Sequence, residues 1–219
     1  PSWQMGPGAY RVNAYTKGGA TLRTLEGYLG WTTFQRVMST YFRTYAFRHP
    51  EPRDFFAVAE AVSGERLDWF FSQVHDDSVV FDYAVGPVQS WREDEPWGYA
   101  EGEPHPSGAA DPRPQWGSSV TVHRWGEGRF PLAVEVTFSD GTRRVEHWDG
   151  QARWTTFRYE HPGRVDRVRV DPSHVLVLDT EFSNNAWLRE APAELAATKW
   201  ASHWMLWAQH TLEAFAFFA

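Results

Sequence analysis

The chain of 219 residues contains no cysteine. No disulfide and no thiolate metal site can therefore form, although this absence does not fix the cellular compartment. Lysine and arginine form no block, and the formal net charge is -7. Electrostatic binding to nucleic acid needs a concentrated basic surface, so we expect no nucleic-acid partner. Acidity of this size instead favours solubility.

The sequence also lacks a long apolar run. A membrane-spanning helix needs roughly 20 nearly unbroken apolar residues. Residues 187–219 come nearest, but this segment is interrupted by polar side chains, namely Lys199, His203, Gln209, His210 and Glu213. No charged and then apolar segment follows Pro1, so the pattern predicts a processed or trimmed N-terminus rather than a signal peptide.

No metal-binding motif is present. A helical His-Glu-x-x-His places two histidines on one face with the glutamate as base, but no two histidines here are four residues apart. His203 and His210 are seven residues apart and share a face of the last predicted helix, yet no third ligand lies nearby in the sequence. We also find no nucleophile elbow and no glycine-rich phosphate loop. The sequence therefore predicts no metal site in this chain.

The first third of the sequence has helical periodicity. With 42% hydrophobic residues the chain can bury a core. Residues 1–9 are expected to be irregular, and the apolar spacing then predicts helices over 16–29, 32–47, 51–62 and 67–74. The apolar stripe of the second helix includes Phe34, Met38 and Phe42. Gly30 and Gly64 are expected to end two of the helices, since glycine is the preferred residue just past a helix. Residues 1–77 are thus predicted to form a helical subdomain.

The pattern changes to alternating strands at about residue 78. Short runs over 79–85, 120–125, 132–138, 143–148, 154–159, 165–170 and 175–178 predict strands, with a long irregular segment over 91–117. Asp140-Gly141 and Asp149-Gly150 are hairpin signals. Regular strands with tight turns predict an antiparallel β-sandwich over 78–182. An amphipathic helix is expected after Pro192, within 183–219. The predicted fold class is α+β, with these three parts in order.

Thirteen tryptophans are many for this length, and most follow residue 69. Trp125, Trp148 and Trp154 alternate with polar residues, which predicts packing in the core or against a neighbouring strand of the sandwich. Exposed tryptophans that form a sugar-binding face would give the same pattern, so a non-enzymatic sandwich that binds a glycan or a protein partner is an alternative function. Trp200, Trp204 and Trp207 suit packing, a partner domain or a membrane surface.

One stretch resembles a known family. Tyr10 and Tyr15 stand five residues apart, and Lys17-Gly18-Gly19 follows. Further motifs come in the family's order: Tyr41, Tyr45-Ala-Phe47, Asp54-Phe55, Ser63-Gly64, Leu67-Asp68-Trp69-Phe70-Phe71-x-Gln73 and Asp82-Tyr83. Together they resemble the zinc aminopeptidases of the membrane alanyl aminopeptidase and leukotriene-hydrolase (gluzincin) type, over residues 10 to about 90.

The resemblance implies roles for four residues. Residues 1–77 would be the end of a thermolysin-like catalytic domain, with the sandwich after it. Tyr15 would donate a hydrogen bond to the attacked carbonyl oxygen, which gains negative charge in the transition state. Tyr10 is a second catalytic candidate. Gly18 and Gly19 would let the backbone pass close to the substrate or to the metal helix.

The family's metal-binding elements are absent. The sequence has no His-Glu-x-x-His, no later glutamate ligand and no Gly-Ala-Met-Glu-Asn strand. The resemblance therefore implies the C-terminal part of a bacterial-type zinc aminopeptidase. Zinc would belong to the intact parent enzyme and not to this fragment. The implied partners are an N-terminal catalytic part with the zinc helix and a peptide substrate, with a membrane surface as a further partner for the last helix.

Overall fold

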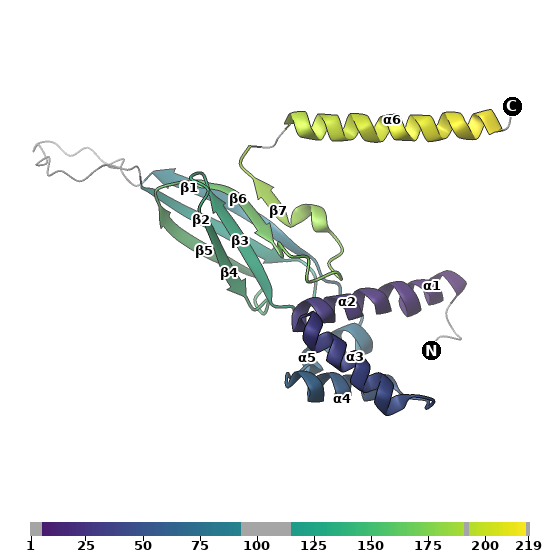
Figure 1. Cartoon of the computed structure of the whole chain (residues 1–219). Coiled ribbons are helices and arrows are strands. Elements are labelled where there is room, and N and C mark those ends of the chain that lie inside the picture. The colour runs from purple at the N-terminus through teal and green to yellow at the C-terminus, as the bar shows by residue number, and fades with distance from the viewer. Residues whose placement is uncertain (1–5, 93–114, 191–192, 218–219) are drawn as a thin grey trace, which may run out of the picture. The chain divides into compact units, whose positions relative to one another are not determined.

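A computed structural model describes residues 6–92, 115–190 and 193–217 (Figure 1). The chain divides into two compact units, Pro1–Trp187 and Leu188–Ala219. The first contains helices and two antiparallel sheets, and the second contains the C-terminal helix α6 (Ala193–Phe217). The predicted α+β class is therefore confirmed. Most of the irregular segment predicted over 91–117 lies outside the described residues.

The four helices predicted over residues 16–74 are present, and a further helix precedes them. The helical elements of this part are α1 (Pro7–Arg11), the π-helix η2 (Val12–Lys17), α2 (Gly18–Leu29), α3 (Trp31–Tyr45), α4 (Pro52–Ser63), α5 (Asp68–Phe71) and the π-helix η3 (Ser72–Asp76). The expectation of an irregular stretch up to residue 9 is wrong at its end, because α1 begins at Pro7. Proline is accepted in the first turn of a helix, where its missing N–H has no partner to lose.

Local signals set the ends of these helices. Gly30 and Gly64 have φ angles of 78° and 74°, and the N–H of each donates to a carbonyl four residues earlier. A side chain with a Cβ is strained in this conformation, so glycine ends both helices as predicted. At the start of α4, the Asp54 carboxylate accepts a hydrogen bond of 2.8 Å from the Glu51 N–H, within a reciprocal capping box.

Within the described residues, seven strands form two sheets. The first has the order β1 (Tyr83–Arg92), β2 (Trp116–Arg124), β5 (Trp154–His161), and the second has the order β4 (Arg143–Trp148), β3 (Leu132–Phe138), β6 (Val165–Val170), β7 (Ala186–Leu188). Val134, Val136 and Phe138 on β3 are buried, while the residues between them are partly exposed. This alternation is the pattern of a strand with one face on the core.

Of the two predicted hairpins, one is present and one is not. Asp140-Gly141 joins β3 to β4, and the Gly141 N–H donates to the Phe138 carbonyl. Asp149-Gly150 instead carries the chain from β4 in the second sheet to β5 in the first, so the second hairpin prediction is wrong. A Cβ on Gly150 would lie 2.3 Å from the Phe130 carbonyl oxygen, which shows that this turn is packed against the core.

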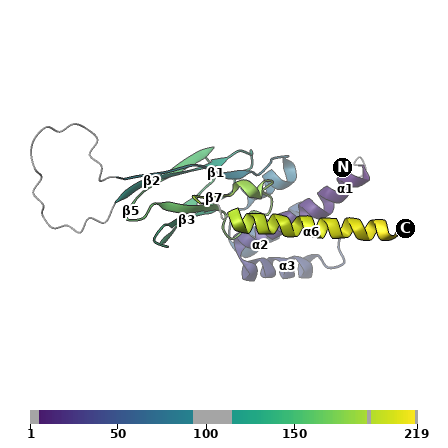
Figure 2. The same cartoon turned by 90° about the horizontal axis from the view of Figure 1, so that it is seen from above.

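Helix α2 packs directly against the sandwich. The buried Thr24 hydroxyl accepts a hydrogen bond of 3.1 Å from the Val177 N–H, and a Cβ on Gly27 would meet Val175 at 3.1 Å. The prediction of a strand over 175–178 is wrong. This segment is an irregular loop that packs against α2. Both views show α2 and α3 at one end of the strands (Figures 1 and 2).

Phe130 joins the helices to the sandwich. Its ring is 1% exposed and lies 5.8 Å from the ring of Tyr28, 5.7 Å from that of Trp69 and 6.1 Å from that of Phe70. Aromatic pairs in such edge-on and tilted arrangements contribute beyond the area that they bury. The helical part and the sandwich therefore share one hydrophobic core.

Helix α3 is buried along only part of its predicted stripe. Phe34 and Val37 are buried, whereas Met38 is 37% and Phe42 is 72% exposed. The prediction that Phe42 faces the core is wrong. α3 packs against α2 and α4, so the side of the helix that carries Phe42 is left to solvent.

Tyr83 is a fully buried tyrosine with a complete hydrogen-bond set. Its hydroxyl accepts from the Phe130 N–H at 2.7 Å and lies 3.1 Å from the Phe130 carbonyl oxygen, to which it can donate. Its ring packs edge-on against Trp148, with 5.5 Å between the centroids. Burial raises the pKa of Tyr83 to about 12, although its contact with Phe130 acts in the opposite direction.

This raised pKa predicts a pH dependence of stability. Between the ordinary tyrosine pKa of 10.0 and about 12, the unfolded chain loses the Tyr83 proton while the folded chain keeps it. The free energy of unfolding should therefore fall as pH rises through this window, with a slope of ~1.4 kcal/mol per pH unit from this group. Well below pH 10, Tyr83 is protonated in both states, and its full contribution to the free energy of unfolding is present.

Tyr83→Phe isolates the effect. At neutral pH we expect it to cost about 1–3 kcal/mol, because the buried Phe130 N–H loses its acceptor. The difference between the two proteins in urea unfolding should then shrink as pH rises above 10, since only the wild type contains Tyr83. A difference that stays constant up to about pH 12 would contradict the assignment.

Candidate functional site

The predicted catalytic tyrosines lie where the N-terminal helix changes its winding. α1 passes into the π-helix η2 and then into α2 without a break. Tyr10 is in α1 and is 41% exposed, and Tyr15 is in η2 and is 68% exposed. π-Helical turns inside α-helices are rare and often occur at functional sites. No feature of the sequence indicates this turn.

The π-turn brings the two tyrosines together. In a regular α-helix, residues five apart point about 140° away from each other, since each residue turns the helix by about 100°. The wider winding of η2 reduces this angle. The rings of Tyr10 and Tyr15 are in edge-on contact, with 6.2 Å between the centroids. Both phenols therefore lie on one side of the helix.

A pocket of about 420 Å³ lies beside Tyr15, and we call it the Tyr15 pocket. Three of the four predicted site residues line it, namely Tyr15, Gly18 and Gly19, while Tyr10 does not. Phe55 and Phe56 of α4 and Phe71 of α5 add aromatic walls, and the rings of Phe56 and Phe71 are stacked with 4.0 Å between the centroids. This combination of apolar walls with a few polar groups is typical of ligand pockets.

Polar groups of the Tyr15 pocket come from η2, from η3 and, through Thr21, from α2. Asn13 and Lys17 belong to η2, and the Asn13 amide donates to the Ala9 carbonyl oxygen at 2.9 Å. His75 belongs to η3, and its Nδ1 lies 2.9 Å from a carboxylate oxygen of Asp76. Phe56 and His75 could not be predicted as site residues, because only the tertiary structure brings α4 and η3 to the pocket beside Tyr15.

The two glycines face open space. A Cβ built on Gly18 or Gly19 meets nothing within 4 Å. The predicted close approach at this point would therefore involve a group outside this chain. The roles of all four predicted residues stay predictions.

Among residues 6–92, 115–190 and 193–217, no group of three or more histidine, cysteine, aspartate or glutamate side chains could hold a metal ion. His203 and His210 belong to no such group within the described part of the chain. The residues that this structure describes do not fit a zinc site.

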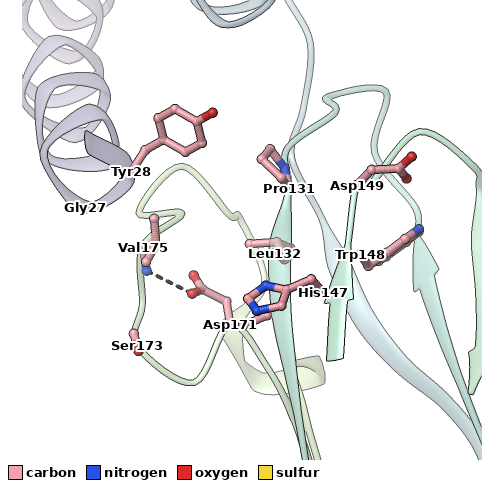
Figure 3. A pocket seen from close by; sticks show the side chains of 11 residues that line it. Gly27, Tyr28, Pro131, Leu132, His147, Trp148, Asp149, Asp171, Ser173 and Val175 are labelled. Atoms are coloured by element: carbon pink, nitrogen blue, oxygen red, sulfur yellow. Dashed lines mark hydrogen bonds between the residues drawn. The ribbon is translucent and has the colours of Figure 1, made fainter. Parts of the chain in front are cut away.

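A second pocket, of about 500 Å³, lies between the end of α2 and the second sheet (Figure 3). Tyr28 stands on the helix side, and His147 and Asp171 stand on the sandwich side. The Asp171 carboxylate accepts from the Val175 N–H at 3.0 Å and from the Leu176 N–H at 2.8 Å. Asp171 therefore shapes the loop that receives α2, and none of the predicted site residues lines this pocket.

The tryptophans predicted to pack in the sandwich divide into two kinds. Trp148 is 5% exposed and contacts Tyr83, so the prediction is confirmed there. Trp125 and Trp154 are 61% and 59% exposed, so packing in the core is wrong for both, whereas packing against a neighbouring strand holds for Trp154. Trp154 pairs with His123, next to the inward-facing Val122, and the pleat directs both side chains outward.

In α6, Trp200, Trp204 and Trp207 are 63%, 62% and 60% exposed within the described structure. Over the described residues, no helix combines the length and the apolar character that crossing a bilayer requires. Binding of this helix to a membrane surface stays a prediction.

Part of this chain is similar in sequence to known proteins. Residues 6–74 match the family model described as Peptidase family M1 domain. The chain is 40% identical over 52 residues to Aminopeptidase M1-D of Oryza sativa subsp. japonica, and 34% identical over 59 residues to Aminopeptidase M1 of Arabidopsis thaliana. These matches cover 24% and 27% of this chain, but only 6% and 7% of the relatives.

A solved structure extends the likeness in fold. The crystal structure of Legionella pneumophila aminopeptidase A in complex with aspartic acid matches with a TM-score of 0.51 and 14% identity. The match covers 78% of this chain and 18% of that chain. Together the comparisons confirm the resemblance to the membrane alanyl aminopeptidase-like family. This resemblance is distant and covers only part of the chain. Residues 6–74 are similar to the Peptidase family M1 domain.

Proposed function

We propose that this chain is the C-terminal part of a zinc aminopeptidase and that Tyr15 stabilises the transition state of peptide hydrolysis. The single observation that carries the proposal is the position of Tyr15. It stands exposed on a π-turn beside an aromatic-walled pocket, within the segment that matches the Peptidase family M1 domain. A hydroxyl buried in a self-contained core could not reach a substrate.

The chemistry of a phenol suits this role. A tyrosine hydroxyl keeps its proton at neutral pH and can donate a hydrogen bond. Aimed at a carbonyl oxygen that gains negative charge, this bond is stronger in the transition state than in the ground state, and it therefore raises the rate. Tyr10 contacts the Tyr15 ring edge-on, so in this proposal it helps to orient the phenol.

Zinc would be held outside this chain. The described residues do not fit a zinc site, so we assign no step of the reaction to the metal. The proposed partners are an N-terminal catalytic part that carries the zinc helix and a peptide substrate. Gly18 and Gly19 support such docking, because the space beside them is open.

The proposal is tested with two proteins, the chain of 219 residues and the longer protein whose C-terminal part it would form. The longer protein should hydrolyse aminoacyl 4-nitroanilides, lose this activity to a chelator and regain it with zinc. The pure chain should contain far less than one zinc per molecule by elemental analysis and give no turnover. Robust metal-dependent turnover by the pure chain would contradict the proposal, as would a zinc-loaded longer protein without peptidase activity.

A further inference from the structure

The β1–β2–β5 sheet is labelled in Figure 1. Its outer face carries three exposed tryptophans, and we call it the tryptophan face. Val120 and Val122 of β2 are fully buried, so the side chains between and beyond them point away from the core. The exposed tryptophans of this face are Trp91, Trp125 and Trp154, with exposed fractions of 42%, 61% and 59%.

Trp91 lies flat on the sheet at one end of this face. It pairs with Gly117 across β1 and β2, and a Cβ built on Gly117 would lie 2.4 Å from both Cε2 and Nε1 of the indole. The ring thus occupies the space that a side chain at 117 would need. One side of the indole is covered by the strand, and 42% of the residue is exposed to solvent.

The other end has an aromatic cluster. His123 stacks on Trp125 with 4.9 Å between the centroids and an angle of 12° between the planes, and it pairs across the strands with Trp154. The imidazole also lies over Gly86, where a Cβ would come within 2.4 Å of it. Glycines at 86 and 117 therefore accommodate flat rings at both ends of the face.

A polar stripe connects the two ends. The hydroxyls of Thr121 and Thr156 are hydrogen-bonded at 2.8 Å, and Ser119 of β2 shares the outward direction of Thr121. Arg158 and Glu160 of β5 are exposed and balance in charge. From residue 117 to residue 123, at about 3.4 Å per residue, the stripe runs for about 20 Å.

We propose that the tryptophan face binds a neutral, extended polysaccharide of β-linked pyranoses. Each pyranose has an apolar C–H side that stacks on an indole and a rim of hydroxyls that suits the threonines and Ser119. The length of the stripe fits several sugar rings in a row, with Trp91 and Trp154 at the ends. Its charge balance favours a neutral sugar over a uronic acid.

Two other occupants fit the face less well. A nucleic acid would need a basic groove beside the rings, and here one arginine is matched by one glutamate. A protein partner would favour a continuous apolar centre that loses its water, whereas hydroxyls separate the aromatic ends of this face. The inference stands on the sandwich alone and is independent of the proposed peptidase role.

The test is native affinity electrophoresis of the full chain in gels that contain one soluble polysaccharide each: mixed-linkage β-glucan, hydroxyethyl cellulose or galactomannan. Retardation by at least one is expected. Trp91→Ala and Trp154→Ala should each weaken binding about tenfold, as loss of one stacking platform predicts. Gly117→Ala should do the same while keeping all three indoles, because its Cβ displaces the Trp91 ring.

Trp31→Ala is the matched control, since Trp31 is 61% exposed but belongs to α3. It should leave retardation unchanged, and thermal unfolding should show that every variant is folded. Absence of retardation by all three polysaccharides would overturn the proposal. So would retardation that survives both face variants, an equal loss in Trp31→Ala, or binding that is found only with a peptide.

Discussion

Replacement of Tyr15 by phenylalanine in the longer protein is expected to lower kcat by about 10²–10³-fold, the usual effect of removing one hydrogen-bond donor to a developing oxyanion. KM should change little, because the hydroxyl would act on the transition state rather than on the bound substrate. Tyr15 is 68% exposed, so the substitution should not alter folding. Steady-state kinetics with aminoacyl 4-nitroanilides measure both constants.

Two other tyrosines, Tyr41 and Tyr10, serve as a control and a comparison in this experiment. Tyr41→Phe is the control, because Tyr41 lies on α3 and packs its ring against Tyr45 and Phe55. It should leave kcat unchanged. Tyr10→Ala should give a smaller fall than Tyr15→Phe, since the Tyr10 ring would orient the other ring. An unchanged kcat in Tyr15→Phe would remove Tyr15 from the mechanism, and a change confined to KM would assign it to substrate binding alone.

Phe130→Ala is expected to lower the free energy of unfolding by about 3–5 kcal/mol, the range for removing a buried phenylalanine from a core. The ring is 1% exposed and contacts aromatic side chains of α2 and α5. Its loss would leave a cavity where the helices meet the sandwich. Urea unfolding of the chain of 219 residues measures the change.

The same experiment tests whether residues 1–77 and 78–182 unfold separately. A shared core predicts one transition, with helical circular dichroism and near-ultraviolet aromatic signals changing together. Phe42→Ala is the matched control, because Phe42 is 72% exposed, and it should change stability by no more than about 0.5 kcal/mol. Two separate transitions, of which Phe130→Ala moves only one, would show that the helices and the sandwich are independent domains.

Only the N-terminal side of the Tyr15 pocket could be predicted from the sequence. Tyr15, Gly18 and Gly19 are close in the chain and fall in one recognisable motif. Phe56 and His75 come from segments at least 37 residues beyond Gly19, and nothing in their own neighbourhoods indicates this pocket. The π-turn escaped prediction because the apolar spacing indicates a helix only from residue 16, whereas the turn covers Val12–Lys17.

The sequence by itself determined the features that depend on neighbours in the chain. Gly30 and Gly64 end their helices, and Asp140-Gly141 forms its hairpin, because backbone conformation and short-range hydrogen bonds suffice at these points. The tertiary structure alone decided that Asp149-Gly150 changes sheets and that Trp154 faces solvent. Both outcomes depend on how two sheets and a helix share one core, and that packing joins residues which are far apart in the chain.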